Sequence, residues 1–427
     1  MKNKQGWLLV SLSFFIYFVC DGLTFSFGLI FVDILGYFGR STSRTSLIAS
    51  FINCLPLLYS PFVCYLIARF GFQKCTILAG LMIFISFCIS FFVSNFHLLQ
   101  LVYGFILTFG FSISYLCAYT ILPYWFDRNM PLAAGITVSG SGIGQASFSF
   151  LIQYLLEYYG WQGTSLIVGG ISLNIAVLGY LYRVPDKLPI SERKITSKLI
   201  VDKFDAGKKN ARYYYRKSIE ILCIRQIWLF FVVNFFLMMA FSTPYVFLAD
   251  YIKSHNIHLS PAIPYALMGI STTISQFLLG WAANKRLVSD WMLYSLTMFL
   301  SALSSLLPVI WPYSRAACII HAVAFATFIS PSYVLMITLL IECAGDHNLD
   351  ISLGYTQIFQ GLASLIGLPI CGLLKDRTGD YIWSYIFTAI SLFISSILMI
   401  LWPMFKKTKS SNMAASDNSE HSSFISG

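Results

Sequence analysis

Asp21 is the residue of this 427-residue chain whose type and position point most directly to chemistry. It lies about halfway along the first long apolar stretch, in the run Phe-Val-Cys-Asp-Gly-Leu-Thr-Phe. A carboxylate at that depth in a membrane is costly, and such residues usually face a cavity or a partner on an ion or substrate pathway. Two functional roles follow: Asp21 carries a proton, or it attracts a cationic group of a solute. The alternative is a protonated Asp21 with a hydrogen bond inside a helix bundle.

Further polar side chains lie deep in other apolar stretches, where each alone is more typical of a hydrogen bond between helices than of a ligand. A histidine changes charge near neutral pH, so His321 is a candidate proton relay, and Tyr333 is a weaker pathway candidate. The sequence has no Walker motif, metal-ligand cluster or catalytic triad, so we expect no cofactor, no metal and no enzymatic activity. The deep polar residues are Asn53, Gln145, Asn234, Gln276, His321, Gln357 and Gln360.

The amino-acid composition indicates that these side chains belong to a membrane protein. Apolar residues make up 57% of the chain and charged residues 11%, with a mean hydropathy of +0.72. A soluble protein would need more charge to cover its surface. A helix needs roughly 20 apolar residues to cross a bilayer, which predicts an all-α membrane protein with twelve transmembrane helices. The predicted spans are 7–32, 45–68, 75–94, 98–124, 131–157, 163–182, 227–252, 262–283, 291–310, 315–343, 351–374 and 382–405.

Charge placement predicts the orientation of these spans. If the N-terminus is cytoplasmic, 6 of the 28 Lys and Arg residues fall on the opposite side and the other 22 on the cytoplasmic side. Loops rich in Lys and Arg stay cytoplasmic, so we expect both termini there. Tryptophan prefers the headgroup region, and all nine lie at or beside predicted span ends. The six basic residues are Arg40, Arg44, Lys253, Arg315, Lys375 and Arg377; the tryptophans are Trp7, Trp125, Trp161, Trp228, Trp281, Trp291, Trp311, Trp383 and Trp402.

The chain divides at one long polar interruption. We predict a first six-helix bundle at 1–182, a cytoplasmic basic loop at 183–226, a second six-helix bundle at 227–405 and a disordered cytoplasmic tail at 406–427. The loop carries twelve basic residues against five acidic ones. This excess is typical of an orientation signal in contact with anionic membrane lipid, so we do not expect nucleic acid as a partner.

The two halves are faint copies of each other. Sliding 127–160 onto 346–379, an offset of 219, superposes seven identical residues, which gather at loop polar positions and glycines. The fifth and eleventh spans match in order and orientation, as in the parallel six-span repeat of the major facilitator architecture. The matched pairs are Asp127 with Asp346, Asn129 with Asn348, Gly135 with Gly354, Thr137 with Thr356, Gly142 with Gly361, Leu155 with Leu374 and Gly160 with Gly379.

The segment 124–144, Tyr-Trp-Phe-Asp-Arg-Asn-Met-Pro-Leu-Ala-Ala-Gly-Ile-Thr-Val-Ser-Gly-Ser-Gly-Ile-Gly, resembles the fifth-span signature of the monocarboxylate transporter family. The likeness continues at 160–163, 244–251 and 360–381, the last resembling the family's eleventh span. It implies the major facilitator fold and transport of a small organic solute by alternating access. Some members of that family need a single-span glycoprotein partner, for which nothing in this sequence gives support.

The sequence departs from the family's lactate carriers at the charged residues that bind the carboxylate and the proton. Those proteins use a lysine in the first span and an Asp/Arg pair in the eighth. Alignment from Gly6-Trp7 places Phe25 at the lysine position, and alignment from Gly280 places Thr272 and Gln276 at the other two. A substrate carboxylate without a cationic partner is unfavourable in a low-dielectric cavity. The same alignment implies that Asn53 and Gln276 face the cavity.

Two further groups of residues are predicted to serve gating and helix packing. Arg69, in the loop after the second span, and the pair Asp127 and Arg128 resemble cytoplasmic gate charges of major facilitator proteins. Positive-inside loop residues are the alternative for the first of these. Gly135, Gly140 and Gly144 belong to a stripe of small residues that lets a neighbouring helix approach closely. The stripe is chiefly structural, with the fifth span as a moving surface during transport.

We therefore expect a secondary transporter of the plasma membrane for a monocarboxylate or related metabolite, with proton symport through Asp21 as one hypothesis. A carrier for a neutral, zwitterionic or cationic metabolite is an alternative, because the charged carboxylate-binding set is absent. A transporter-like receptor that binds solute without moving it is the alternative from another class.

Overall fold

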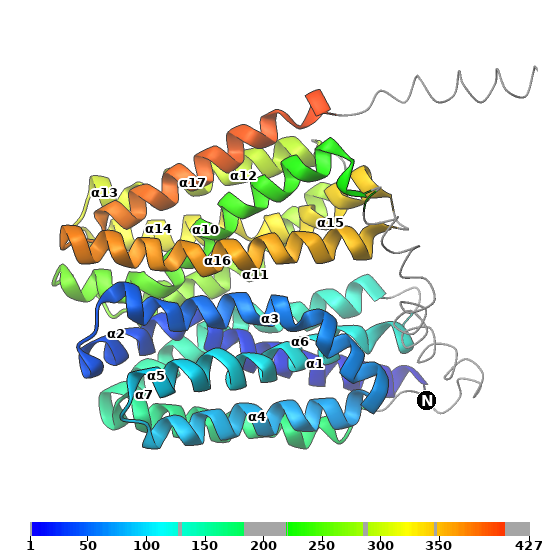
Figure 1. The fold of residues 1–427 in the computed structure, drawn as a ribbon, viewed down its shortest axis with the longest axis horizontal. Coiled ribbons are helices and arrows are strands. Elements are labelled where there is room, and N and C mark those ends of the chain that lie inside the picture. Colours follow the sequence, from blue (N-terminus) through cyan, green and yellow to red (C-terminus); the bar gives the residue numbers. More distant parts are fainter. Residues whose placement is uncertain are drawn as a thin grey trace, which may run out of the picture.

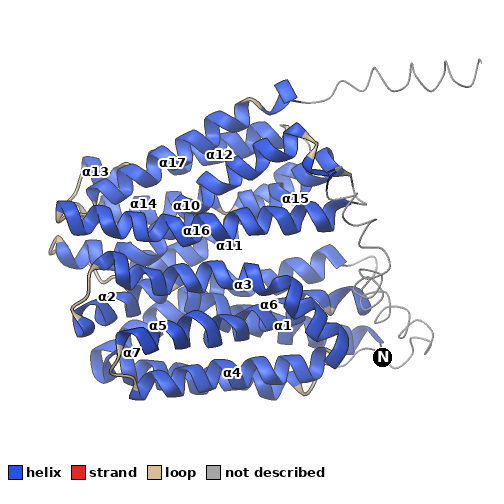
Figure 2. Ribbon diagram, viewed as in Figure 1, coloured by secondary structure: helices blue, strands red, loops and turns tan. Residues whose placement is uncertain are grey.

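The structure is a computed structural model that describes residues 2–126, 130–182, 219, 221–284, 289–345 and 348–405. Within these ranges every regular element is a helix, as Figure 2 shows. The predicted 406–427 tail, most of the 183–226 loop and the gate pair Asp127 and Arg128 lie outside the described residues.

The helices of the first half begin close to the predicted span starts. Loop glycines end some of them: Gly39, after the first span, and Gly71, after the second, both have positive φ angles, which glycine adopts without strain. The elements are α1 (Lys2–Phe25), α2 (Phe27–Phe38), α3 (Thr42–Phe70), α4 (Phe72–Phe92), α5 (Phe96–Leu101), the π-helical turn η1 (Val102–Leu107), α6 (Thr108–Thr120), the 3-10 turn η2 (Leu122–Tyr124) and α7 (Met130–Gly179).

The second half repeats this helical pattern. Its tenth span is interrupted where α14 ends at Ile329 and α15 begins with Pro331, a residue that lacks the N–H a continuing helix requires. The elements are α10 (Arg225–Ser254), α11 (Ala262–Asn284), α12 (Asp290–Ser305), α13 (Leu307–Ile310), α14 (Arg315–Ile329), α15 (Pro331–Ala344), α16 (Leu349–Thr378), α17 (Ile382–Ile400) and η4 (Trp402–Phe405).

All twelve predicted spans coincide with helical segments. Ten segments of the described chain are long and apolar enough to cross a membrane. One of them, Leu132–Gly179, is 48 residues long and contains both the fifth and the sixth predicted spans. They meet at Gly160, where φ is 61° and the backbone is not helical. The eighth predicted span is α11, with 23 residues.

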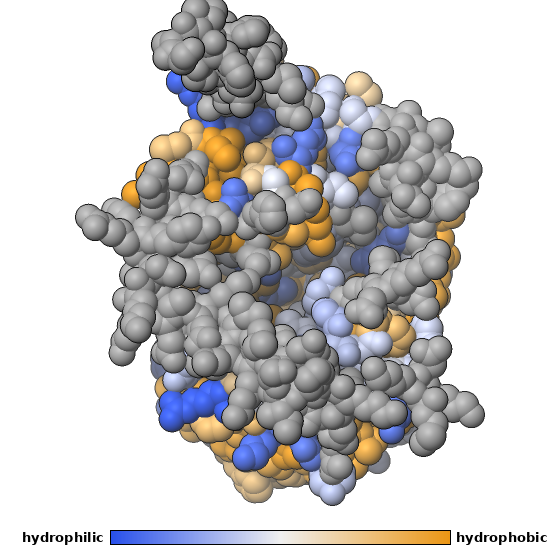
Figure 3. Space-filling view, turned by 90° about the vertical axis from the view of Figure 1, so that its right-hand side faces the viewer, coloured by the Kyte–Doolittle hydropathy of each residue, from blue (hydrophilic) through white to orange (hydrophobic). Residues whose placement is uncertain are grey.

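The helices form two bundles that lie one above the other in Figure 1, with α1–α7 below and α10–α17 above. The N-terminus and the turn η4 lie at the same end. We call this the inner end and the opposite one the outer end, following the predicted orientation. Figure 3 views the inner end, where described hydrophilic residues border a recess near the middle of the face.

The internal repeat has structural counterparts at the matched glycines. Gly160 and Gly379, which pair at the offset of 219, both follow a long helix with positive φ, 61° and 80°. A β-carbon on Gly142 would lie 2.4 Å from the Gly269 carbonyl oxygen of α11. Its counterpart Gly361 faces Cys54 of α3, again in the other bundle. The fifth and eleventh spans therefore occupy equivalent places at the interface between the bundles.

The tryptophans lie near the ends of helical segments, as their sequence positions predict, but they differ in burial. Trp228, Trp311 and Trp383 are 46–57% exposed. Trp161 and Trp402 are buried, with 4% and 1% exposed, and their placement at the headgroup level stays a prediction. The Trp402 ring packs edge-on against Phe230, which shows that it serves the core of the second bundle.

Candidate functional site

Asp21 lies one turn before the break between α1 and α2, and its carboxylate faces the interior of the first bundle. The Tyr115 hydroxyl of α6 donates a hydrogen bond to Asp21 Oδ1 at 2.5 Å. Ser141 of α7 lies next to the same carboxylate. A hydrogen bond to a carboxylate is stronger than one between neutral groups. Side chains of α6 and α7 thus surround the acidic group of α1.

Phe25, at the position of the family's lysine, joins the two bundles through aromatic contacts. Its ring centroid lies 5.0 Å from that of Tyr245 and 6.2 Å from that of Phe241, both on α10. Tyr333 of α15 packs edge-on against Phe241 at 5.6 Å. Phe25 lies one helical turn after Asp21 on α1. The structure thus brings Asp21, Phe25 and Tyr333 into one region between the bundles.

Thr272 and Gln276 extend this region along α11. The Thr272 hydroxyl is buried without a hydrogen-bond partner among the described residues, and Tyr245 of α10 lies next to it. Gln276 is half-buried and lies one turn further along the same helix.

Gln145 of α7, one of the deep polar residues of the predicted spans, belongs to the same interface. Its side chain is 1% exposed, and its Nε2 lacks a partner among the described residues. Its carbonyl oxygen accepts a hydrogen bond from the Ser26 hydroxyl at 3.4 Å, at the break in the first span. A β-carbon on Gly269 of α11 would lie 3.1 Å from the Gln145 β-carbon.

Three predicted pathway or gate residues are placed elsewhere. Asn53 Nδ2 donates to the Ala49 carbonyl of its own helix at 2.9 Å. His321 is fully buried in the second bundle, with Nδ1 2.8 Å from the Ser304 carbonyl oxygen and its ring against Tyr385. Arg69 is exposed and donates to the Tyr65 hydroxyl at 3.0 Å. The structure does not bring these three side chains to Asp21.

The second bundle contains the interhelical hydrogen bond that its deep amides predict. Gln360 Nε2 of α16 donates to Asn234 Oδ1 of α10 at 2.9 Å, and the Tyr294 hydroxyl of α12 donates to the same oxygen at 3.4 Å. A buried polar group is stable when it is paired in this way. For Asn234 and Gln360 the structural interpretation is therefore confirmed.

The glycine stripe of α7 has two faces. A β-carbon on Gly140 would lie 2.3 Å from the Phe14 carbonyl oxygen, and one on Gly144 would lie 2.1 Å from that of Phe18. Both contacts are with α1, so these glycines permit close packing as predicted. For Gly135 the packing prediction was wrong, because a β-carbon there would have no neighbour within 4 Å.

At the outer end, two hydrogen-bonded clasps connect the bundles. In the first clasp, Asp376 of α16 accepts the backbone N–H groups of Thr42 and Ser43 at 2.8 and 2.9 Å. In the second, Gln153 Oε1 of α7 accepts the Ser260 hydroxyl at 2.7 Å and the Ala262 N–H at 2.8 Å. Each clasp satisfies N–H groups that a helix start leaves without intrahelical partners. The structure is therefore closed at the outer end.

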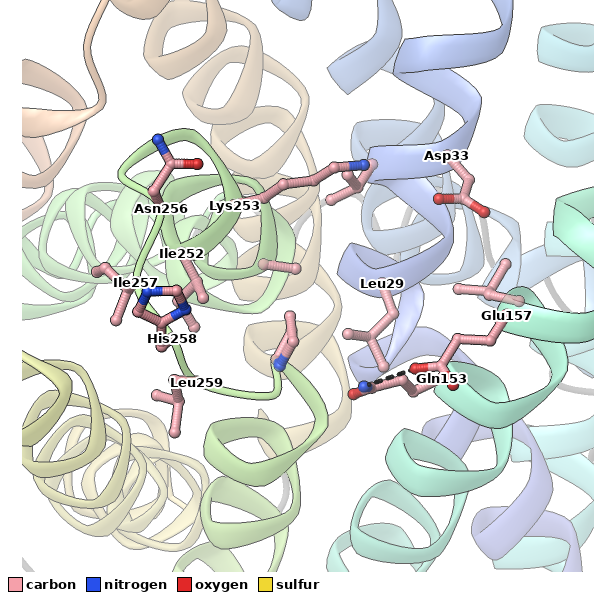
Figure 4. Close-up of a pocket in the computed structure, with 14 residues that line it drawn as sticks. Leu29, Asp33, Gln153, Glu157, Ile252, Lys253, Asn256, Ile257, His258 and Leu259 are labelled. Carbon is pink, nitrogen blue, oxygen red and sulfur yellow. Dashed lines mark hydrogen bonds between the residues drawn. The ribbon is translucent and has the colours of Figure 1, made fainter.

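A pocket of about 510 Å³ opens between the bundles beside the second clasp, and we call it the vestibule (Figure 4). Its acidic and basic lining residues are Asp33 of α2, Glu157 of α7, and Lys253 and His258 at and after the end of α10. Figure 4 shows Lys253 extending toward Asp33 from the opposite wall. Within the described residues, no cluster of three or more His, Cys, Asp or Glu side chains could hold a metal ion.

Comparisons with known proteins agree with this architecture. The chain matches the family model of the Major Facilitator Superfamily over residues 13–336. It is 28% identical to monocarboxylate transporter 12 of Xenopus laevis over 96% of this chain and 91% of that protein. It is 25% identical to monocarboxylate transporter 9 of Gallus gallus, over 93% of this chain and 92% of that protein. Both relatives carry the family name that the span-five and span-eleven motifs predicted.

Solved structures show the same fold. Two crystal structures of POT family transporters, one with a thioalcohol-conjugated peptide and one with 5-aminolevulinic acid, superpose with a TM-score of 0.71. Each match covers 93% of this chain and 96% of the solved one at 13% identity. At that identity the likeness shows the fold alone.

Proposed function

Because the chain belongs to the Major Facilitator Superfamily, and is thus a multi-pass membrane transporter of a small solute rather than an enzyme, we propose that it works as a secondary carrier by alternating access. The two bundles would rock about the region between Asp21 and the aromatic rings of α10. The observation that carries this proposal is the half-buried Asp21–Tyr115 hydrogen bond beside that interface. An ionisable residue inside a membrane is retained for function rather than for stability.

The surroundings of Asp21 favour a solute that bears a cationic group. Phe25, Thr272 and Gln276 stand where the lactate carriers have charged side chains, so the eighth span offers no arginine for a carboxylate. Aromatic rings attract cations through their faces, and Tyr245 and Phe241 lie against Phe25. We therefore propose a zwitterionic or cationic metabolite ahead of lactate or pyruvate. Because both relatives are named monocarboxylate transporters, the test also includes monocarboxylates.

The test is uptake into vesicles that contain the purified full chain, with and without an inward proton gradient. The labelled solutes are lactate, pyruvate, the zwitterion glycine betaine and its isosteric monoanion tert-butylacetate. We expect uptake of betaine to exceed that of the isostere by at least about tenfold, since a lost charge pair is worth more than roughly 1.4 kcal/mol. Uptake of none of the four above empty vesicles would favour the receptor alternative.

Asp21→Asn tests the residue that carries the proposal. The substitution keeps the side-chain shape and removes the charge, so we expect loss of gradient stimulation and at least about a tenfold fall in betaine uptake. Ser13→Ala is the matched control, because Ser13 is also a buried polar residue of α1 but bonds Tyr182 inside the first bundle. Equal loss in both variants would show a packing defect and would contradict the role of Asp21.

We further propose that the carrier lies in the plasma membrane with both termini cytoplasmic, and that the chain divides at the 183–226 loop. The 22-to-6 distribution of basic residues supports the orientation. Epitope tags at the two ends should be detected in permeabilised cells and remain hidden from antibody in intact ones. A tag exposed on intact cells would overturn the orientation.

A further inference from the structure

We propose that the vestibule is an outer binding site for a small zwitterionic solute, which enters it before reaching Asp21. The inference rests on the proposed transport function and adds a second site to it. The vestibule lies at the interface that must open if the two bundles rock, so it is on the path of any solute that arrives from outside. Its volume of about 510 Å³ is within the usual size range for sites that hold small molecules.

The charges of the vestibule are separated by bundle. The two carboxylates, Asp33 and Glu157, belong to α2 and α7 of the first bundle. The basic side chains, Lys253 and His258, belong to the second bundle. One wall is therefore acidic and the facing wall basic. A solute with a cationic and an anionic end fits across the pocket in one direction, its cationic end toward the first bundle.

The charged side chains on the opposing walls approach each other but remain accessible to solvent. Lys253 and Asp33 both line the pocket, and Figure 4 shows the two side chains approaching from opposite walls. Lys253 and Glu157 are exposed and Asp33 is half-buried, so water and solute can reach all three. An exposed pair of charges is worth little by itself. A zwitterion can replace that weak contact with two contacts of its own.

The remaining lining gives the site an apolar floor and a fixed edge. Leu29 of α2 and Ala249 and Ile252 of α10 are buried and line the pocket. At the edge, Gln153 is held by Ser260 and Ala262 and donates to Glu157 Oε1 at 3.2 Å. A mostly apolar pocket with a few oriented polar groups is the usual form of a small-molecule site.

Asp21 on α1 and Asp33 on α2 are twelve residues apart. At 1.5 Å per residue this is about 18 Å along a helix axis, with the α1–α2 break between them. Both carboxylates belong to the first bundle, so a solute that binds the vestibule with its cationic end toward Asp33 already has the polarity that Asp21 requires. The vestibule thus favours a solute with the same charge pattern as the region around Asp21.

Protection of a cysteine in the vestibule tests the proposal without relying on transport. Val32 lines the pocket, and Val32→Cys in the full chain can be labelled on intact cells with a membrane-impermeant maleimide. We expect glycine betaine at twice its dissociation constant to slow labelling about threefold, because two thirds of the sites are then occupied. The isosteric monoanion tert-butylacetate should not slow it.

Three controls keep the test decisive. Gly36→Cys lies near the outer end, is exposed and has no neighbours within 4 Å, so betaine should leave its labelling unchanged. Asp33→Asn and Lys253→Met, each combined with Val32→Cys, should abolish the protection. Equal protection by betaine and its isostere, unchanged protection in either charge variant, or none at tens of millimolar betaine would overturn the site.

The same cells separate this proposal from the proposed function. Asp21→Asn should lower betaine uptake at least about tenfold and leave protection of the cysteine at residue 32 intact, because Asp21 does not line the vestibule. Transport of betaine without protection would refute the vestibule and leave the carrier standing. If betaine protects the cysteine at residue 32 but the chain with an intact Asp21 takes up no betaine, the vestibule is supported and the carrier is refuted.

Discussion

Tyr115 contributes to the site through its hydrogen bond to Asp21, and this dependence can be tested. Its hydroxyl donates to Asp21 Oδ1 at 2.5 Å. Hydrogen bonds to charged groups contribute about 1.5–3 kcal/mol. We expect Tyr115→Phe to lower uptake of the transported solute by about tenfold or more, measured as initial rate in vesicles.

A double-mutant cycle gives the outcome that would contradict this role. If Tyr115 acts through the carboxylate, Tyr115→Phe should have no further effect in the Asp21→Asn background. Tyr17→Phe is the matched control, since its ring packs on Tyr115 at 5.4 Å and the substitution keeps the ring. Additive losses in the double variant would show that Tyr115 does not act through Asp21.

Asp21 could be found from the sequence because a carboxylate inside an apolar stretch is energetically costly, and such residues usually serve a function. Tyr115 could not, because it is one of 25 tyrosines and nothing in its neighbourhood marks it. Its role depends on how α1 and α6 pack side by side. Likewise Asn53 was predicted to face the cavity, and only the structure shows its amide bonded to its own helix.

At the scale of helices, the two faces of α7 should respond differently to the same substitution. A methyl group on Gly144 would collide with α1 inside the first bundle, whereas one on Gly142 would collide with Gly269 of the opposite bundle. We expect Gly144→Ala to lower the melting temperature, since its neighbour is backbone that cannot move aside. Gly142→Ala should leave the first bundle folded and disfavour the outer-closed arrangement.

Gly135→Ala is the control for both, because a β-carbon at Gly135 would meet nothing within 4 Å. Thermal unfolding of the three purified variants measures the first effect. Maleimide labelling of Val32→Cys measures the second, since the vestibule should become more accessible in Gly142→Ala. Equal melting temperatures for Gly144→Ala and Gly135→Ala would show that α1 and α7 do not pack as described.

The spans were predictable because each needs a long apolar stretch, and the helices agree with all twelve ranges. The irregularities within them were not. The first span breaks at Ser26, and the fourth contains a π-helical turn at Val102–Leu107. Such features depend on packing against neighbours, because an apolar stretch has no internal signal for where a helix loosens. Pro331 is the exception, since proline itself marks the break in the tenth span.

At the scale of the whole molecule, the two outer clasps are related by the internal repeat. Thr42 and Ala262 are the first residues of α3 and α11, the second and eighth spans. Each donates its N–H to a side chain near the outer end of the partner span, the eleventh or the fifth. The offset of 219 places Glu157, which bonds Gln153, at the position of Asp376. Both clasps must therefore open together when the bundles rock.

This coupling predicts additive effects on the balance between outer-closed and outer-open states. Capping a helix start is worth about 1 kcal/mol, so Asp376→Ala and Gln153→Ala should each favour opening by roughly that amount. The double variant should shift the ratio of open to closed molecules by about 2 kcal/mol, or roughly 30-fold. The single variants should give intermediate populations.

Spin labels at residues 36 and 311, one on the outer end of each bundle, provide the measurement, since both sites are exposed. The distance distribution should gain a longer component in each single variant and be dominated by it in the double variant. A rigid-body motion breaks both clasps at once, which is why their free energies add although the clasps lie on different helices. If one substitution alone opened the outer end as fully as both, a single clasp would control closure and the repeat-related pairing would have no mechanical role.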